Sequence, residues 1–235
     1  MRYVTALWVV MAVLAGAMEA AAKPHVVNFG KWASVTWSAE AGKPLALKIR
    51  GLYVDGQLKE FTFSTPHEIT DRLYVVRRAF RVNDALPDDT VPRWEWQPGG
   101  WLLVDRVSGH VTQIVLPEFD PYYSAASWYR DYMAYCGISD DGKKLLGMVS
   151  QLGRRKVILK KTLGEINAAD ANGDDAVAAN CFTPTWQRQP ARVTFQVKGG
   201  ETAVFAIHGR AAEMVTEQTA GESASGEDEE DKTTE

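Results

Sequence analysis

Short apolar runs separated by Gly, Pro, Asn and Asp fill the chain between Lys31 and Ile207, and no long segment keeps the period of a helix. The clearest pair of runs lies on either side of Asp55-Gly56. Asp-Gly favours a two-residue hairpin turn in which both residues take positive φ. About ten to twelve runs at this spacing predict an all-β domain of antiparallel hairpins, arranged as a sandwich, a barrel or a partial propeller.

Turn residues set the limits of the expected strands. Residues 98–100 (Pro-Gly-Gly) and 140–142 (Asp-Asp-Gly) each separate two runs. Residues 162–169 are the one candidate for a turn of helix. Strands are expected at residues 45–54, 57–64, 72–82, 94–97, 101–106, 110–116, 129–138, 144–149, 154–160, 192–197 and 202–207.

Two passages have the pattern of propeller blades. In residues 101–111 a strand ends at Asp and turns through Ser-Gly, and residues 132–146 contain Ser-Asp-Asp-Gly-Lys. The second passage resembles the Ser-x-Asp-Gly-Lys turn of TolB-like and WD-type repeats. The resemblance covers about 50 of the 235 residues and implies blade-like hairpins without assigning functional residues. Because a blade takes about 40 residues, the body holds at most four or five, which excludes a complete six- or seven-bladed propeller.

The N-terminal segment has the features of an export signal. Arg2 provides a positive start, residues 4–17 are uncharged and mostly apolar, and residues 20–22 are alanines. Fourteen residues of helix rise about 21 Å, which is short of the roughly 30 Å hydrocarbon core of a bilayer. A cleaved signal peptide at residues 1–22 is therefore favoured over an uncleaved anchor. The mature protein is expected to be periplasmic or secreted, with no stable membrane span.

Cys136 and Cys181 are the only cysteines of the chain. Because disulfides persist in oxidising compartments, an exported chain is expected to join them. The bridge would close a loop of about 46 residues and contribute about 4 kcal/mol on the chain-entropy model. The alternative is a pair of buried thiols. A catalytic cysteine ranks below both, since neither residue lies in a nucleophile motif.

The net charge of -4 combines two unlike regions. Residues 217–235 hold eight acidic residues and one lysine, whereas residues 23–216 hold 24 bases and 21 acids. Because residues 216–235 have no apolar periodicity, they are predicted to form a disordered acidic tail. Residues 23–215 are the expected β domain, and its weak positive charge does not favour binding to nucleic acid.

Two basic runs lie in the body, one with Arg77, Arg78 and Arg81 and one in residues 154–161. Neighbouring residues of a strand point to opposite faces, so each run divides its charge between two faces. The simplest interpretation is a solvated sheet edge that blocks association with other sheets. The alternatives are an anionic partner such as envelope polysaccharide, or the protein's own acidic tail, bound loosely and released by salt.

Nine Trp and Tyr residues lie within the 42 positions from Trp94 to Tyr135. Exposed rings can stack on sugar faces or anchor a protein partner. The competing interpretation is core packing, because strand alternation directs part of any such set inward. The candidate binding residues are Trp94, Trp96, Trp101, Tyr122, Tyr123, Trp128 and Tyr129.

Glu118 and Asp120 place two carboxyl groups near these rings, as in a glycosidase, which needs a pair about 5 to 9 Å apart across a cleft. The alternative is a turn at Pro121, where Asp is common.

Residues 66–72 combine His67 with two carboxylates and an arginine, but the spacing of a zinc site is missing. A capped turn in which Asp71 pairs with an arginine is expected there. Residues 170–181 begin like a calcium loop, yet they lack its Gly at the sixth position and its Glu at the twelfth. An EF-hand is thus excluded, although a weaker, irregular calcium site is left open.

These observations favour an exported, non-catalytic module that binds or organises material in the cell envelope, with a polysaccharide or a protein as partner. We expect no cofactor and no metal. One alternative is a carbohydrate-active or other hydrolase whose carboxylates come from distant strands. The other is a subunit that pairs with a partner chain through an exposed sheet edge.

Overall fold

The computed structural model of the protein describes residues 25–38, 44–122, 124–166 and 181–215. All regular elements in these ranges are β-strands and all their ladders are antiparallel, which confirms the predicted fold class. No helix in the described ranges is long and apolar enough to cross a membrane. The signal peptide and the acidic tail lie outside these residues, so both stay predictions.

The described residues form sixteen strands in three sheets. The first sheet contains β1 (Val27–Phe29), β2 (Ala33–Ser38), β3 (Pro44–Val54), β4 (Gln57–Thr62), β5 (His67–Glu68), β6 (Leu73–Asn83), β7 (Trp94–Asp105) and β8 (Val111–Ile114). The second contains β9 (Ala126–Tyr129), β10 (Tyr132–Ile138), β11 (Lys144–Gln151) and β12 (Leu159–Glu165). The third contains β13 (Thr185–Gln187), β14 (Arg192–Gln196), β15 (Thr202–His208) and β16 (Ala211–Met214).

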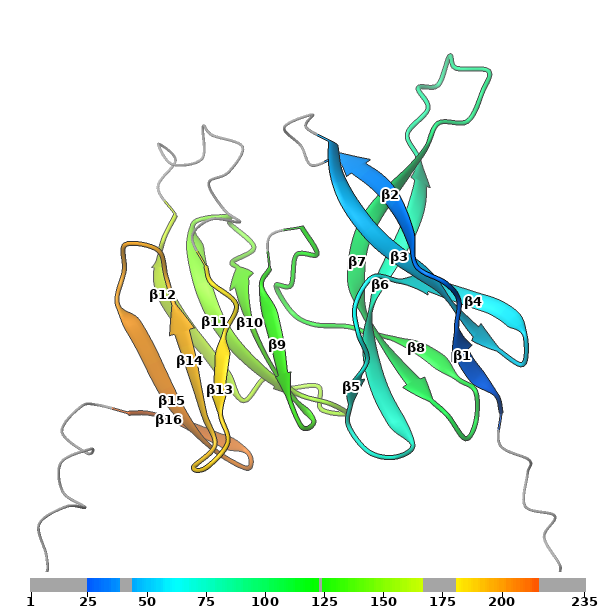
Figure 1. Ribbon diagram of the computed structural model, residues 1–235. Helices are drawn as coiled ribbons and strands as arrows, with labels where there is room; N and C mark the ends of the chain where they lie inside the picture. The colour runs from blue at the N-terminus through cyan, green and yellow to red at the C-terminus, as the bar shows by residue number, and fades with distance from the viewer. Residues whose placement is uncertain (1–24, 39–43, 123, 167–180, 216–235) are drawn as a thin grey trace, which may run out of the picture.

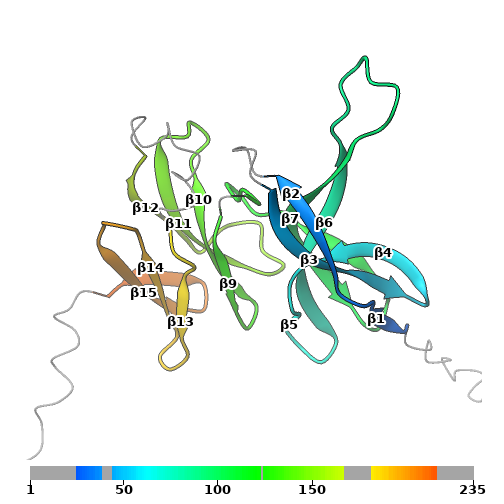
Figure 2. The same ribbon diagram turned by 45° about the horizontal axis from the view of Figure 1, so that its top comes forward.

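Four consecutive strands pair in chain order three times: β5 to β8, β9 to β12, and β13 to β16. Figures 1 and 2 show these meanders standing side by side, with β1 to β4 attached to the outer side of the first. Stacked four-stranded meanders are the architecture of propeller blades. The predicted antiparallel hairpins are therefore confirmed, and their stacking resembles the partial-propeller form of the prediction. Kinship with TolB-like or WD-type proteins stays a prediction.

The middle sheet is buried on both faces. Alternate side chains of β10 and β11 pack against the first sheet in a cluster of Val75, Trp101, Met133, Tyr135, Leu146 and Met148. The intervening side chains pack against the third sheet in a cluster of Ala134, Cys136, Leu145, Val149, Cys181, Val193, Phe195, Phe205 and Ile207. Two-sided burial explains why β10 and β11 are apolar at successive positions rather than at alternate ones.

A third cluster lies on the other face of β6 and β7. Because β1 and β3 curl over this face, it is covered by the N-terminal strands. The buried members of the cluster are Leu52, Tyr74, Val76, Leu102 and Val104. Each pair of neighbouring layers is thus held together by its own apolar cluster.

The hairpin turns predicted at residues 55–56, 108–109 and 140–142 are confirmed. Asp55 and Gly56 have φ of 51° and 78°, as the two-residue turn requires. In the first propeller-like passage, the hydroxyl of Ser108 donates a hydrogen bond of 2.8 Å to Asp105. In the second passage, the backbone N–H of Lys143 donates to Asp141 at 3.1 Å. Carboxylates that accept from the turn hold both hairpins in shape.

The predicted break at residues 98–100 is wrong, because β7 runs through it without interruption. The register of β6 and β7 shifts between Arg77 and Ala79, so the glycines form a bulge and not a turn. A Cβ on Gly99 would lie 3.1 Å from the carbonyl oxygen of Arg78, so glycine allows the two strands to approach closely here.

Two other expected strands are placed wrongly. The strand expected at residues 129–138 begins only at Tyr132, because the chain turns at Arg130 with φ of 54° between β9 and β10. The strand expected at residues 154–160 is shifted to β12 by its pairing with β11. This shift also excludes a helical turn at residues 162–165, while residues 167–169 lie outside the described ranges.

Tyr135 links the middle sheet to the pH dependence of stability. Its buried hydroxyl donates to the carbonyl oxygen of Pro117 at 2.9 Å, and burial raises the pKa of Tyr135 from 10.0 to about 12. As pH rises, the Tyr135 hydroxyl therefore ionises in the unfolded chain before it does so in the folded one. Its contribution to stability is fully present below pH 10 and is lost between pH 10 and 12. We expect Tyr135→Phe to lower the free energy of unfolding by about 1 kcal/mol at pH 7.

The same substitution should make the alkaline fall shallower, since one shifted group is lost. Urea unfolding at pH 7, 9, 10 and 11 on both proteins measures this. Parallel pH profiles for the two proteins would contradict the assignment.

Candidate functional site

The first strands of the three meanders, β5, β9 and β13, meet around a cavity of about 710 Å³. Its walls come from all three strands and from the residues next to them in the chain. The lining residues are His67, Glu68, Ile69, Ser127, Trp128, Tyr129, Arg130, Pro184, Thr185, Trp186 and Arg188.

A second cavity of about 350 Å³ lies beside the first, and its lining reaches the turn between β15 and β16. The two cavities share Tyr129, Arg130, Trp186 and Arg188, and the second ends at Gly209. We call the two cavities together the inner groove.

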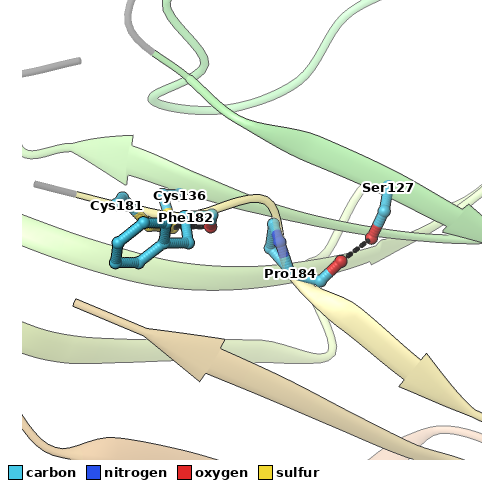
Figure 3. Close-up of a disulfide and its surroundings, with 5 residues drawn as sticks. All are labelled: Ser127, Cys136, Cys181, Phe182 and Pro184. Atoms are coloured by element: carbon cyan, nitrogen blue, oxygen red, sulfur yellow. Dashed lines mark hydrogen bonds between the residues drawn. A yellow bond between two sulfur atoms is a disulfide. The ribbon is translucent and has the colours of Figure 1, made fainter. Parts of the chain in front are cut away.

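The disulfide fixes the strand that forms one wall of the inner groove. Cys136 of β10 is bonded to Cys181, four residues before β13, with 6.4 Å between the Cα atoms, which confirms the predicted pairing. Close to this bond, the Ser127 hydroxyl donates to the carbonyl oxygen of Pro184 at 2.5 Å (Figure 3). The segment from Cys181 to β13 is therefore attached to the middle sheet at two points.

Four Trp and Tyr rings line the inner groove: Trp128, Tyr129, Tyr132 and Trp186. Trp128 lies parallel to the His67 ring with centroids 5.9 Å apart, and Tyr129 lies 5.5 Å from Trp186. The indole N–H of Trp186 donates to the carbonyl oxygen of Ser127 at 3.4 Å. These contacts fix the ring orientations before any ligand arrives, which lowers the entropy cost of binding.

The charge of the inner groove is positive. Its carboxylate, Glu68, is paired with Arg106 at 2.7 Å, and this hydrogen bond raises the pKa of Arg106. Arg130 and Arg188 are exposed, and neither forms an ion pair within the described ranges. The His67 ring donates through Nε2 to the carbonyl oxygen of Arg130 at 2.9 Å, because a carbonyl can only accept. Two guanidinium groups are thus available to an anion.

The seven candidate aromatic residues do not form one platform. Trp128 and Tyr129 line the inner groove, whereas Trp101 is only 7% exposed and packs edge-on against Trp128 in the core. Trp94 and Trp96 lie beside Arg81 at the far end of β7, where Trp94 is 57% exposed.

The remaining two candidates lie elsewhere. Tyr122 contacts Trp37 of β2 with centroids 5.7 Å apart. Tyr123 lies outside the described residues.

The two carboxylates considered for catalysis have structural contacts. Glu118 pairs with Lys160, and neither Glu118 nor Asp120 lines the inner groove. Asp120 caps its turn, because its carboxylate accepts from the backbone N–H of Tyr122 at 2.7 Å. Both residues therefore stabilise the connection between β8 and β9.

The turn after β5 is capped, but by a different ion pair from the expected one. Glu68, and not Asp71, pairs with Arg106, while the carbonyl oxygen of Asp71 accepts from the same guanidinium. Within the described ranges, no group of three or more His, Cys, Asp or Glu residues could hold a metal ion. The calcium-like segment from residue 170 lies outside those ranges.

The first basic run divides its charge as strand alternation predicts. Arg77 points inward and donates to the carbonyl oxygen of Pro121 at 2.5 Å, and burial lowers its pKa to about 10. Arg78 pairs with Glu60 at 3.0 Å on the other face. In the second run, residues 154–156 are exposed in the turn between β11 and β12.

Sequence reasoning missed Arg130, Trp186 and Arg188. Trp186 stands alone in a polar stretch, and both arginines follow strands of only three or four residues. The usable signal was a ring followed two residues later by arginine, in Trp128-Tyr-Arg130 and Trp186-Gln-Arg188.

Comparison of the chain with protein-family models, with curated proteins and with solved structures gave no match.

The disulfide gives a direct test of how the third sheet is held. On the chain-entropy model, replacing both Cys136 and Cys181 with Ala should lower the free energy of unfolding by about 4 kcal/mol. Urea unfolding monitored by tryptophan fluorescence measures this. Ser127→Ala is the control, since it removes only the bond to Pro184 and should cost about 1 kcal/mol. A double variant as stable as the control would show that packing alone positions β13.

Proposed function

We propose that this protein is an exported, non-catalytic binding module of the cell envelope, that the inner groove is its binding site, and that its ligand is an acidic polysaccharide. The observation that carries the proposal is the joining of Trp128, Tyr129 and Trp186 with Arg130 and Arg188 in one groove. Rings and cations together match the two features of an acidic sugar, a ring face and a carboxylate.

The chemistry of each group supports this ligand class. An aromatic ring presents a flat apolar face, which covers the C–H face of a sugar. An arginine presents two parallel N–H donors, which match a carboxylate in bidentate geometry. The residues that line the inner groove extend from β5 to the turn after β15, and its two cavities have volumes of about 710 and 350 Å³.

The carboxylate content favours binding over hydrolysis. Among the described residues that line the inner groove, Glu68 is the one carboxylate, and Arg106 holds it. A glycosidase of the common type needs two carboxyl groups about 5 to 9 Å apart. The hydrolase alternative therefore has less support than the binding module.

An extracytoplasmic location fits the disulfide, because such bonds persist in oxidising compartments. Export itself rests on the predicted signal peptide.

Titration calorimetry with polygalacturonate at low salt tests the proposal. We expect Trp186→Ala to weaken binding about tenfold or more, as for a ring at a binding hot spot. Arg188→Gln should weaken binding and also reduce its salt dependence, because one charge pair is lost.

Trp94→Ala is the matched control, since this ring is exposed but lies far from the inner groove. An equal loss in the control, or equal affinity for a neutral polysaccharide such as dextran, would contradict the proposed site.

A further inference from the structure

The described chain ends near the inner groove. Gly209 lines the groove, β16 begins two residues later at Ala211, and Val215 is the last described residue. Six residues at the strand rise of about 3.3 Å place Val215 roughly 20 Å from the groove. Residues 216–235 therefore start within a short distance of the site.

The charge of that segment is the opposite of the charge of the groove. Residues 227–231 are five consecutive acids, Glu-Asp-Glu-Glu-Asp. Arg130 and Arg188 line the groove, and Arg210 is exposed beside Gly209. Within the described ranges, none of these three arginines forms an ion pair.

We propose that the acidic run at residues 227–231 binds in the inner groove of its own chain and competes there with anionic ligands. The inference rests on the proposed function only in placing the anion site in this groove. The segment imitates the ligand by its carboxylates, so an external polyanion has to displace it.

The length of the connection suits this contact. Eleven residues separate Val215 from Glu227. A polar segment of that length has a root-mean-square span of about 20 Å when it forms no regular structure, which matches the distance to the groove. The effective concentration of a tethered group is highest when its span matches the distance, so the intramolecular contact is favoured over contact with a second copy.

A spin label placed next to the acidic run tests the contact directly. Ser225→Cys carries the label in the full chain, and the indole N–H signals of the tryptophans are recorded by NMR. We expect broadening at Trp186 and Trp128 and none at Trp94. The broadening at Trp186 and Trp128 should disappear at 0.5 M NaCl, because at this salt concentration the interaction between exposed charges is screened over about 4 to 5 Å.

The double variant Arg130→Gln with Arg188→Gln should also lose the broadening. A label at Asp88→Cys in the loop between β6 and β7 is the control. Unbroadened groove signals would overturn the proposal. The proposal would also be overturned if, in a mixture, spin-labelled chains broadened the groove signals of isotope-enriched chains that carry no label, since the contact would then lie between copies.

A second measurement tests competition. At 50 mM salt, the full chain with its acidic run neutralised should bind polygalacturonate about fivefold or more tightly than the unaltered chain. At 0.5 M salt the two proteins should bind it with equal affinity. The substitutions are Glu227→Gln, Asp228→Asn, Glu229→Gln, Glu230→Gln and Asp231→Asn. A control variant with the same change of charge should gain less affinity for polygalacturonate. It neutralises five exposed acids elsewhere: Asp88→Asn, Asp140→Asn, Glu165→Gln, Glu201→Gln and Glu213→Gln.

The two proposals fail in different ways. If the unaltered chain binds polygalacturonate through Trp186 but neutralising residues 227–231 changes nothing, the competition is refuted and the proposed function stands. If the spin label broadens Trp186 while neither protein binds polygalacturonate, the proposed ligand is wrong and the intramolecular contact stands.

Discussion

Burial of the β9 to β12 sheet on both faces is the constraint on which the rest of the structure depends. Its two central strands supply side chains to two separate apolar clusters, one toward β6 and β7 and one toward β14 and β15. Such packing leaves little room at its margins. At Gly137 a Cβ would lie 2.6 Å from the carbonyl oxygen of Glu118, so the connection between β8 and β9 can pass directly over β10. Loss of this sheet would separate the other two.

The inner groove follows from the same stacking. Because each meander contributes its first strand to one side, three segments far apart in the sequence meet there: β5, β9 and β13. Their functional groups lie on short strands and tight turns, and the sheets behind them provide the rigidity. Backbone carbonyl oxygens of Ser127, Arg130 and Arg188 accept hydrogen bonds from Trp186, His67 and Tyr129, so the rings and turns of the three strands fix one another.

Local sequence pattern was enough to predict the fold class and the Asp55-Gly56 turn, since both depend on residues close together in the chain. The disulfide could be predicted because the chain has two cysteines and therefore one possible pairing. Local sequence pattern failed at Gly99 and at Arg130. A Pro-Gly-Gly bulge within a strand has the same composition as a turn, and the turn at Arg130-Asp131 places its positive φ on an arginine, which does not mark such a turn in the sequence. The groove could be predicted only in part, because Trp128 and Tyr129 stood out by their density, whereas Trp186 is brought to them by stacking of the sheets.

The position of the disulfide affects how the molecule opens. Within the described ranges, the third sheet contributes to one apolar cluster and the middle sheet to two. The third sheet should therefore open at a lower free energy, and amide protons of β14 to β16 should exchange faster than those of β10 and β11. The bond to Cys136 holds the chain just before β13, so this strand should stay with the middle sheet during such openings. Transient loosening of the outermost layer would therefore leave one wall of the groove in place.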